Sequence, residues 1–307
     1  MIDISLIGTG GMMILPERFL TAMALRYNGS IILTDCGEST QVTLKLLGWG
    51  FKNIDYICCT HFHADHMAGL PCLLLTIGNS GRTEPLTIIG SVGINDVVNS
   101  LRVIAPVLSY EIKFIEISSA ESVNNMKLEN GIELSSLQLS HGMPCLGYSF
   151  KLFRAGKFDV RKALLNNIPK KFWKVLQKGE TVKYEDKIFT PDIVLGEERK
   201  GLKISYITDT LPTDNIPKFI DGSDLFICEG LYGDNEKELN AGKHMHMIFS
   251  QAARLAKLGN VKELWLTHYS PAIGDPQEYI ENAAEIFKNT TAGYDRLTKT
   301  LNFDDKV

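Results

Sequence analysis

Short apolar runs, separated by glycine, asparagine and helical patterns, dominate the first half of this 307-residue chain. Runs of four to eight residues rich in isoleucine predict buried strands. They lie at residues 4–7, 30–33, 56–59, 86–89 and 113–117. Apolar residues at helical spacing predict helices at residues 38–47, 67–76 and 94–105.

The second half repeats this alternation of strands and helices. Strands are predicted at residues 134–139, 203–207, 225–228 and 263–267, and helices at 247–258 and 277–287. Strands that alternate with helices in both halves predict an α/β fold in which two sheets are sandwiched between helices. Polar residues at the strand ends are then expected to meet at the carboxyl edges of the sheets. We expect one domain over residues 1–307.

Residues 151–183 do not follow the alternation. They hold ten basic and two acidic residues, a net charge of +8, whereas the whole chain has −4. Aromatic residues interleave with the cations. One interpretation is a solvated insertion whose charges keep it in solution. A clamp for a phosphate backbone is favoured, because the insertion lies between two regions rich in metal-ligand side chains. The candidate contacts are Lys170, Lys171, Lys174 and Trp173.

Sequence composition indicates where in the cell the protein is expected. No segment approaches the roughly 20 apolar residues of a membrane span, and the chain begins with a predicted strand instead of a targeting segment. The six cysteines are scattered, and the adjacent pair Cys58 and Cys59 does not have zinc-clasp spacing. Small buried thiols in a reducing compartment are the favoured interpretation. We expect a cytoplasmic protein without membrane contact.

Three of the seven histidines lie together in the segment Thr60-His61-Phe62-His63-Ala64-Asp65-His66. Alternation in an extended loop would place His61 and His63 on one side, and a helix that starts next would turn Asp65 and His66 the other way. Neutral imidazole is the commonest metal ligand. Structural zinc sites usually close cysteines around one ion, so this cluster predicts a catalytic metal.

Further ligand candidates each end an apolar run. His141 follows the strand at 134–139, Asp209 follows the strand at 203–207, and His268 follows the strand at 263–267. At such positions a side chain emerges from the core at the edge of a sheet. The three residues therefore add to the cluster and indicate one metal centre.

At this point the chain resembles the metallo-β-lactamase superfamily, and within it the ribonuclease Z branch, which trims the 3′ end of transfer RNA precursors. The resemblance rests on Gly8-Thr9-Gly10, on Asp35-Cys36-Gly37-Glu38-Ser39-Thr40-Gln41, on the histidine cluster with Gly69-Leu70-Pro71, and on His268-Tyr269-Ser270. Residues 156–160 and 178–182 resemble the two ends of the family's protruding arm. The resemblance implies a four-layer αββα sandwich with an inserted basic arm at about residues 154–184.

The resemblance also implies a site and a reaction. One zinc would be held by His61, His63 and His141, and a second by Asp65, His66 and His268, with Asp209 as the bridge; manganese would suit the same ligands. A hydroxide between two such ions would attack phosphorus, oriented by Asp65.

A proton for the leaving 3′ oxygen is expected from His246, because an imidazole suits proton transfer at neutral pH. The carboxylate of Glu229 would orient the imidazole. The neighbouring His244 competes for the role of general acid, and the alternative for it is an exposed position at a helix start.

The implied function is a metal-dependent endoribonuclease that trims precursor tRNA, acting as a homodimer. Residues 16–18 keep only a proline and one basic residue of a family pattern that helps to place RNA. One alternative is a small-molecule metallohydrolase acting on a cyclic nucleotide, another phosphodiester, a thioester or a lactone. Another is an RNA-binding module that has the fold without the metal, against which the full set of seven ligands argues.

Overall fold

The computed structural model describes residues 1–118, 125–185, 187–197 and 199–304. Within them the chain divides into two compact units. The first is formed by Met1–Phe150 and Lys203–Asn302, and the second by Lys151–Leu202 with the chain end from Phe303. The predicted basic arm falls inside the second unit.

The first sheet of the larger unit has seven strands in the order β16-β1-β2-β3-β4-β5-β6. They are β1 (Ile2–Gly8), β2 (Ala22–Tyr27), β3 (Ser30–Thr34), β4 (Ile54–Cys58), β5 (Leu86–Ser91), β6 (Ile112–Ile117) and β16 (Thr298–Leu301). The strands from β3 to β6 run parallel, and β1 pairs antiparallel with β2 and β16. The parallel part needs crossover helices, which the chain supplies between these strands.

The second sheet has the order β15-β14-β13-β12-β9-β8-β7. Its strands are β7 (Met126–Lys127), β8 (Ile132–Leu139), β9 (Cys145–Arg154), β12 (Arg199–Ile207), β13 (Leu225–Glu229), β14 (Leu264–Thr267) and β15 (Thr290–Ala292). Strands β12 to β15 run parallel. Tyr206 of this sheet lies 3.1 Å from the hydroxyl of Thr21, and Tyr148 donates to the Cys59 carbonyl. The two sheets therefore face each other.

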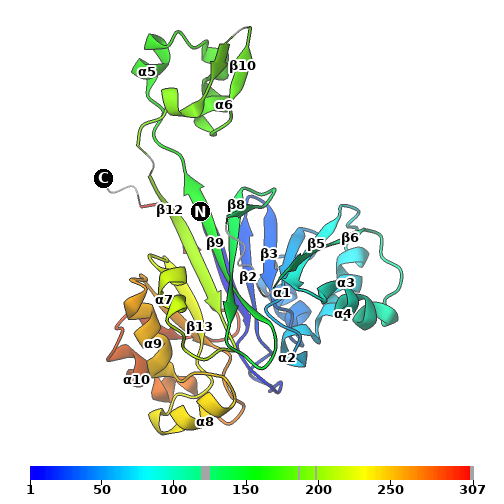
Figure 1. The fold of residues 1–307 in the computed structure, drawn as a ribbon. Coiled ribbons are helices and arrows are strands. Elements are labelled where there is room, and N and C mark those ends of the chain that lie inside the picture. Colours follow the sequence, from blue (N-terminus) through cyan, green and yellow to red (C-terminus); the bar gives the residue numbers. More distant parts are fainter. Residues whose placement is uncertain (119–124, 186, 198, 305–307) are drawn as a thin grey trace. The chain divides into compact units, whose positions relative to one another are not determined.

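Helices cover both outer faces (Figure 1). On the first sheet lie α1 (Thr40–Leu47), α3 (Leu70–Asn79) and α4 (Ile94–Leu101), which share one apolar core with it. On the second sheet lie α7 (Asn215–Ile220), α9 (Phe249–Leu258) and α10 (Glu281–Ala284), which share another. The predicted four-layer αββα sandwich is confirmed.

The structure divides the helix predicted at residues 67–76. Residues Ala64–Met67 form α2, and α3 begins at Leu70. Between them the Gly69 amide donates to the Cys36 carbonyl, and a Cβ at Gly69 would stand 2.2 Å from the Gly37 oxygen. The close approach of two backbones, followed by Pro71 in the first turn of α3, separates the two helices. Short α2 is the segment that carries Asp65 and His66.

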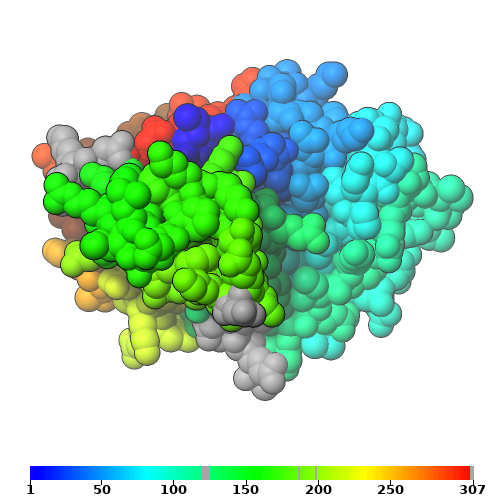
Figure 2. Space-filling view, turned by 90° about the horizontal axis from the view of Figure 1, so that it is seen from above, coloured from blue at the N-terminus to red at the C-terminus, as the bar shows by residue number. Residues whose placement is uncertain are grey.

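The second unit has an apolar core of its own. Its residues, coloured green, form one group in the space-filling view (Figure 2). Its elements are α5 (Val160–Leu165), α6 (Trp173–Gln177), and the hairpin of β10 (Val182–Tyr184) with β11 (Lys187–Phe189). Asp159 caps α5 by accepting the amides of Arg161 and Lys162. Because this core is built locally, the arm is a folded body rather than an extended loop.

Among the described residues, no helix has both the length and the apolar character that crossing a membrane requires.

Candidate metal centre

The candidate ligands lie where strands of both sheets end. The loop that carries His61 and His63 follows β4, and His141 follows β8. Asp209 and His268 come after β12 and β14. Carboxyl ends of neighbouring parallel strands open on one edge of a sheet, so the fold brings residues that lie 200 positions apart in the chain into one cluster.

Left-handed backbone marks several of these strand ends. The φ angles are 60° at Asp35, 53° at Asp209 and 59° at His268. For residues other than glycine this conformation costs roughly 1 kcal/mol or more each, and it is common at functional sites. The sharp turn directs each side chain off the sheet edge and toward the cluster instead of along the strand.

One ligand group consists of His61, His63, His141 and Asp209. The Nδ1 atom of His63 lies 2.9 Å from Nε2 of His61 and 3.3 Å from Nε2 of His141. The Oδ2 atom of Asp209 lies 3.6 Å from the first of these Nε2 atoms and 4.0 Å from the second.

A second group consists of Asp65, His66 and His268. The Nε2 atoms of the two histidines lie 3.3 Å apart, and Oδ2 of Asp65 is 3.3 Å from His268 Nε2. The other carboxylate oxygen of Asp209, Oδ1, lies 3.3 Å from His66 Nε2 and 3.2 Å from His268 Nε2. Asp209 thus offers one oxygen to each group, which is the arrangement of a bridging ligand.

The spacing of the donor atoms fits metal ions. Zinc binds imidazole nitrogen at about 2.0–2.1 Å in tetrahedral geometry, which sets neighbouring donor atoms about 3.3 Å apart. Several nitrogen pairs and nitrogen–oxygen pairs of the cluster lie at 2.9–3.7 Å. Nitrogen and carboxylate oxygen are the donors that zinc and manganese accept. The cluster is a metal-binding site.

Asp35 supports the ligands from behind. Its Oδ2 accepts a hydrogen bond from Nδ1 of His66 at 2.9 Å, and its Oδ1 accepts the amide and hydroxyl of Thr60. The same threonine hydroxyl lies 3.0 Å from Nδ1 of His61. Such partners fix the tautomer and the orientation of metal-binding imidazoles. Asp35 lies in the motif at residues 35–41, but nothing in the sequence indicated that it holds the ligand imidazoles.

Asp65 is tied to the loop that follows β1. Its Oδ2 accepts the backbone amide of Met12 at 2.7 Å. Gly11 lies so near that a Cβ there would stand 2.6 Å from the His268 ring. Although burial favours the neutral acid, the hydrogen bond from His268 and the nearby imidazoles hold the pKa of Asp65 below its usual range. The carboxylate is therefore available as a ligand or as an acceptor for water.

The pKa values of two imidazoles of the centre are shifted in opposite directions. Burial, helped by the neighbouring His66, lowers the pKa of His61 to about 2. Burial acts against the charged form of His66 too, but the carboxylates of Asp209 and Asp35 more than offset it and raise its pKa. A neutral His61 presents its lone pair to a cation without first losing a proton.

His246 stands at the edge of the cluster. Its ring stacks on His268 with centroids 5.4 Å apart, and its Nδ1 lies 2.9 Å from Oε2 of the buried Glu229. The other oxygen of Glu229 accepts the amide of Thr210 at 2.6 Å. Against the effect of burial, Glu229 raises the pKa of His246 to about 9. The Nε2 atom lies 3.9 Å from Asp209, so the ring faces the ligand groups.

The other candidate residues lie outside this cluster. His244 is exposed, and no ligand group found in the described residues includes it. Lys170, Lys171 and Lys174 are exposed on the arm. Trp173 packs on Phe158 with ring centroids 5.3 Å apart and donates its indole N–H to the Ile168 carbonyl. Its ring is half-buried and packs against the arm's own core.

Comparison with known proteins gives close relatives over the whole chain. The chain is 52% identical to "Ribonuclease Z" of Clostridium acetobutylicum over 309 residues, covering 99% of this chain and 100% of the relative. It is 53% identical to "Ribonuclease Z" of Clostridium kluyveri over 305 residues, with 99% and 100% covered. A family model described as "Anti-Pycsar protein Apyc1" matches residues 2–158.

Solved structures share the fold. The short form of human tRNase Z superposes with a TM-score of 0.70 at 23% identity, covering 98% of this chain and 100% of that one. The metallo-β-lactamase fold protein YhfI of Bacillus subtilis superposes with a TM-score of 0.67 at 17% identity, covering 97% and 98%. At these identities the likeness shows the fold alone.

Proposed function

Because the chain belongs to the ribonuclease Z family and is a hydrolase of phosphodiester bonds, we propose that it is an endoribonuclease that trims the 3′ end of precursor tRNA. The observation that carries the proposal is the pair of ligand groups joined through the two oxygens of Asp209. Two cations held there suit an in-line displacement at phosphorus, in which attacking and leaving oxygens both need charge stabilisation.

We assign two zinc ions to the centre, with manganese as the substitute. His61, His63 and His141 would hold one ion, and Asp65, His66 and His268 the other, with Asp209 between them. When bound, the ions would supply a nucleophile at neutral pH and neutralise charge on the phosphate. Asp65 orients the attacking water through the oxygen that also accepts the Met12 amide.

His246 acts as the general acid. The leaving 3′ oxygen of the ribose needs a proton, and Glu229 keeps the imidazole protonated and in place through a 2.9 Å contact. General acid catalysis of this kind contributes about 10²–10⁴-fold to the rate. The exposed position of His244 does not support a competing role for it.

The arm is the proposed holder of the tRNA body. A folded RNA is held largely through phosphates and shape, and the three lysines of the candidate set are exposed on a body that has its own core. Trp173 completes the proposed contact set beside Lys170, whose ammonium lies 6.0 Å from the Trp173 ring centroid. Cleavage of a free tRNA precursor by a chain with six free cysteines suits the cytoplasm.

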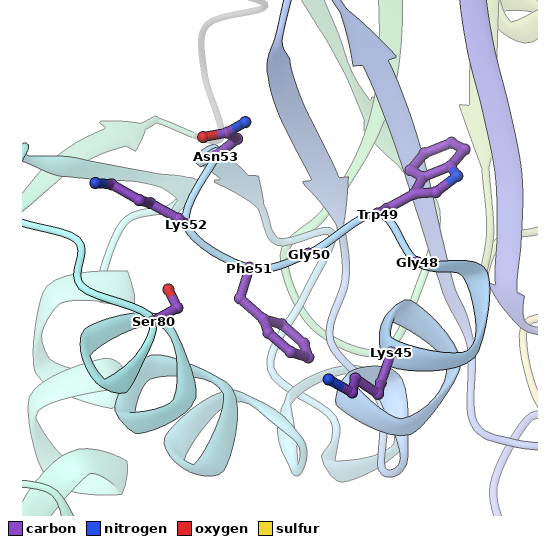
Figure 3. A pocket seen from close by; sticks show the side chains of 8 residues that line it. All are labelled: Lys45, Gly48, Trp49, Gly50, Phe51, Lys52, Asn53 and Ser80. Carbon is purple, nitrogen blue, oxygen red and sulfur yellow. The ribbon is translucent and has the colours of Figure 1, made fainter.

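The active form is proposed to be a homodimer. A groove of about 420 Å³, lined by Val42, Leu46 and Phe51 among others, lies beside α1. Leu46 is 61% exposed and Val42 is 44% exposed. A neighbouring pocket shares Lys45 and Phe51 with the groove, and their side chains point toward each other there (Figure 3). Exposed apolar surface of this kind is typical of protein interfaces.

Cleavage of a precursor transcript with mapping of the cut tests the function. A single cut that leaves a 3′ hydroxyl on the mature tRNA body is expected, and Asp209→Asn should abolish it. Cyclic nucleotides serve as the competing substrates in the same assay. If they are turned over with a higher kcat/KM than the transcript, the protein is instead a small-molecule phosphodiesterase.

A further inference from the structure

The loop after β1 is fastened to the metal centre at several points. The amide of Gly11 donates to the Tyr269 carbonyl at 2.9 Å, directly beside His268. Further along, the Leu15 and Arg18 backbones bond to each other in both directions at 3.0 and 3.1 Å and close a turn. The loop thus has a fixed path over the edge of the site rather than a free one.

Between these anchors the backbone makes a strained turn at Met12. The amide of Met13 donates to the Gly11 carbonyl at 2.7 Å, and Met12 has a φ of 66°. A three-residue turn with a positive φ at its centre is rare and unfavourable. It is held here by the 2.7 Å bond from the Met12 amide to Oδ2 of Asp65. Strain maintained beside reacting groups points to a functional position.

The turn presents two apolar side chains to solvent. Met12 is 65% exposed and Met13 is 56% exposed, so neither serves the core. Adding one N–Cα bond to the amide contact puts the Met12 Cα within roughly 4 Å of the Asp65 carboxylate. The Met12 side chain therefore starts at the rim of the ligand cluster, and the Met13 side chain starts at the next residue.

The cationic side chain of this loop, Arg18, binds the protein itself. The Arg18 guanidinium donates to the carbonyls of Ile273 at 3.0 Å and Gly274 at 2.7 Å, and it lies over the Tyr269 ring. Its nitrogens are committed to the protein backbone, so this arginine is not the group that the loop offers to a phosphate. What the loop offers beside the metal ligands is the pair of methionines.

We propose that Met12 and Met13 form an apolar platform that holds an unpaired nucleobase flanking the scissile phosphate. This inference rests on the proposed ribonuclease function and names a contact within it. Thioethers are adaptable and make favourable contacts with aromatic rings, and proteins hold single-stranded nucleotides by covering the faces of their bases. The strained turn fixes the platform relative to Asp65, and so positions the base relative to the attacked phosphorus.

The test pairs side-chain removal with base removal. Met12→Gly keeps the amide and accepts the positive φ, and Met13→Ala completes the double variant. Met12→Leu with Met13→Leu keeps an apolar surface, and Val103→Ala removes a side chain that is 73% exposed elsewhere. Substrates are a precursor transcript and two versions with an abasic nucleotide on either side of the cut. Bis(p-nitrophenyl) phosphate reports on the metal centre alone.

The platform predicts coupling between protein and base. For the intact transcript the Gly/Ala variant should lose about five- to tenfold in kcat/KM, while the Leu pair and Val103→Ala lose less than twofold. With the abasic nucleotide on the contacted side, wild type and variant should become equal. Because Met12→Gly keeps the amide that holds Asp65, hydrolysis of the nitrophenyl ester should fall by much less than cleavage of the transcript.

Three outcomes would overturn the platform. The first is independence: the fold-losses in kcat/KM from removing the side chains and from removing the base multiply, whichever side of the cut is abasic. The methionines and the base would then not be in contact. An equal loss on the nitrophenyl ester would show that the loop acts only by holding Asp65. If wild type hydrolyses the ester but cleaves no RNA, the ribonuclease function fails, and the platform fails with it.

Discussion

At the scale of single residues, the structure shows a role for Asp35 that the sequence did not indicate. It is buried, it lies outside the candidate ligands, and its Oδ2 holds His66 Nδ1 at 2.9 Å while Thr60 occupies its other oxygen. Its partner is 31 positions away in the chain. No local pattern predicts a pair so far apart in the chain. The ligands within residues 61–66 could be predicted because their spacing is local.

Asp35→Asn should weaken metal binding by about 10–100-fold, because the amide no longer supplies a charged acceptor for the ligand imidazole. Asparagine tolerates the positive φ of this position. Titration against a chromogenic chelator measures the affinity, and Asp96→Asn on the surface of α4 is the control. An unchanged affinity would mean that Thr60 alone sets the orientation of the imidazoles.

A second substitution separates the general acid from the metal ligands. His246→Ala should lower kcat for precursor RNA by about 10²–10⁴-fold, but should lower kcat for bis(p-nitrophenyl) phosphate by less than about tenfold, because nitrophenolate leaves without a proton. Glu229→Gln should act in the same direction more weakly. His244→Ala is the neighbouring control, with no effect expected. Equal losses on both substrates would place His246 among the groups that hold the metal.

At the scale of elements, periodicity predicted the strands that carry the site and missed others. Strands such as β3, β4 and β14 are buried on both faces, and their continuous apolar runs are typical of parallel sheets. By contrast, β2 was not predicted as a strand. Its sequence AMALRY contains alanine, methionine and leucine, which also suit a helix. The β9 strand was not predicted either, and its last residues, 151–154, fall inside the basic segment that the sequence marks as an insertion.

In the arm, composition alone does not separate side chains that would contact substrate from side chains that pack within the arm. Interleaved aromatics and cations predicted substrate contacts for the lysines and for Trp173 alike, but the indole N–H is bonded to Ile168 and the ring packs on Phe158. Only packing distinguishes an exposed aromatic from one that supports the surface. The assignment of the three lysines and of Trp173 to RNA contact stays a prediction.

Replacing Lys170, Lys171 and Lys174 together by glutamine should raise KM for precursor tRNA and leave kcat unchanged. The slope of log affinity against log salt should become shallower by about one for each lost phosphate contact. The matched control changes Lys218, Lys237 and Lys257 in the same way; these lysines are exposed on the larger unit, away from the groove beside α1. If the control triple gives the same change in slope, the arm is not the part that grips the RNA.

At the scale of the larger unit, the metal centre joins the two halves of the sandwich. His61, His63, Asp65 and His66 follow strand β4 of the first sheet, while His141, Asp209 and His268 follow strands of the second. Each ligand group draws from both sides. Cations bound there would therefore act as cross-links between two sheets that otherwise meet through their apolar faces.

Removal of metal should for this reason destabilise the whole unit rather than loosen a loop. A ligand at a thousand times its Kd stabilises by about 4 kcal/mol, which corresponds to a fall in Tm of roughly 8–16 °C for a unit of this size. Scanning calorimetry before and after chelation measures it, with restoration by added zinc or manganese. In Asp209→Asn, which weakens both ligand groups at once, chelation should change Tm far less, because little metal is bound to begin with. A wild-type Tm that stays the same after complete removal of metal would mean that the two sheets hold together without the cross-link.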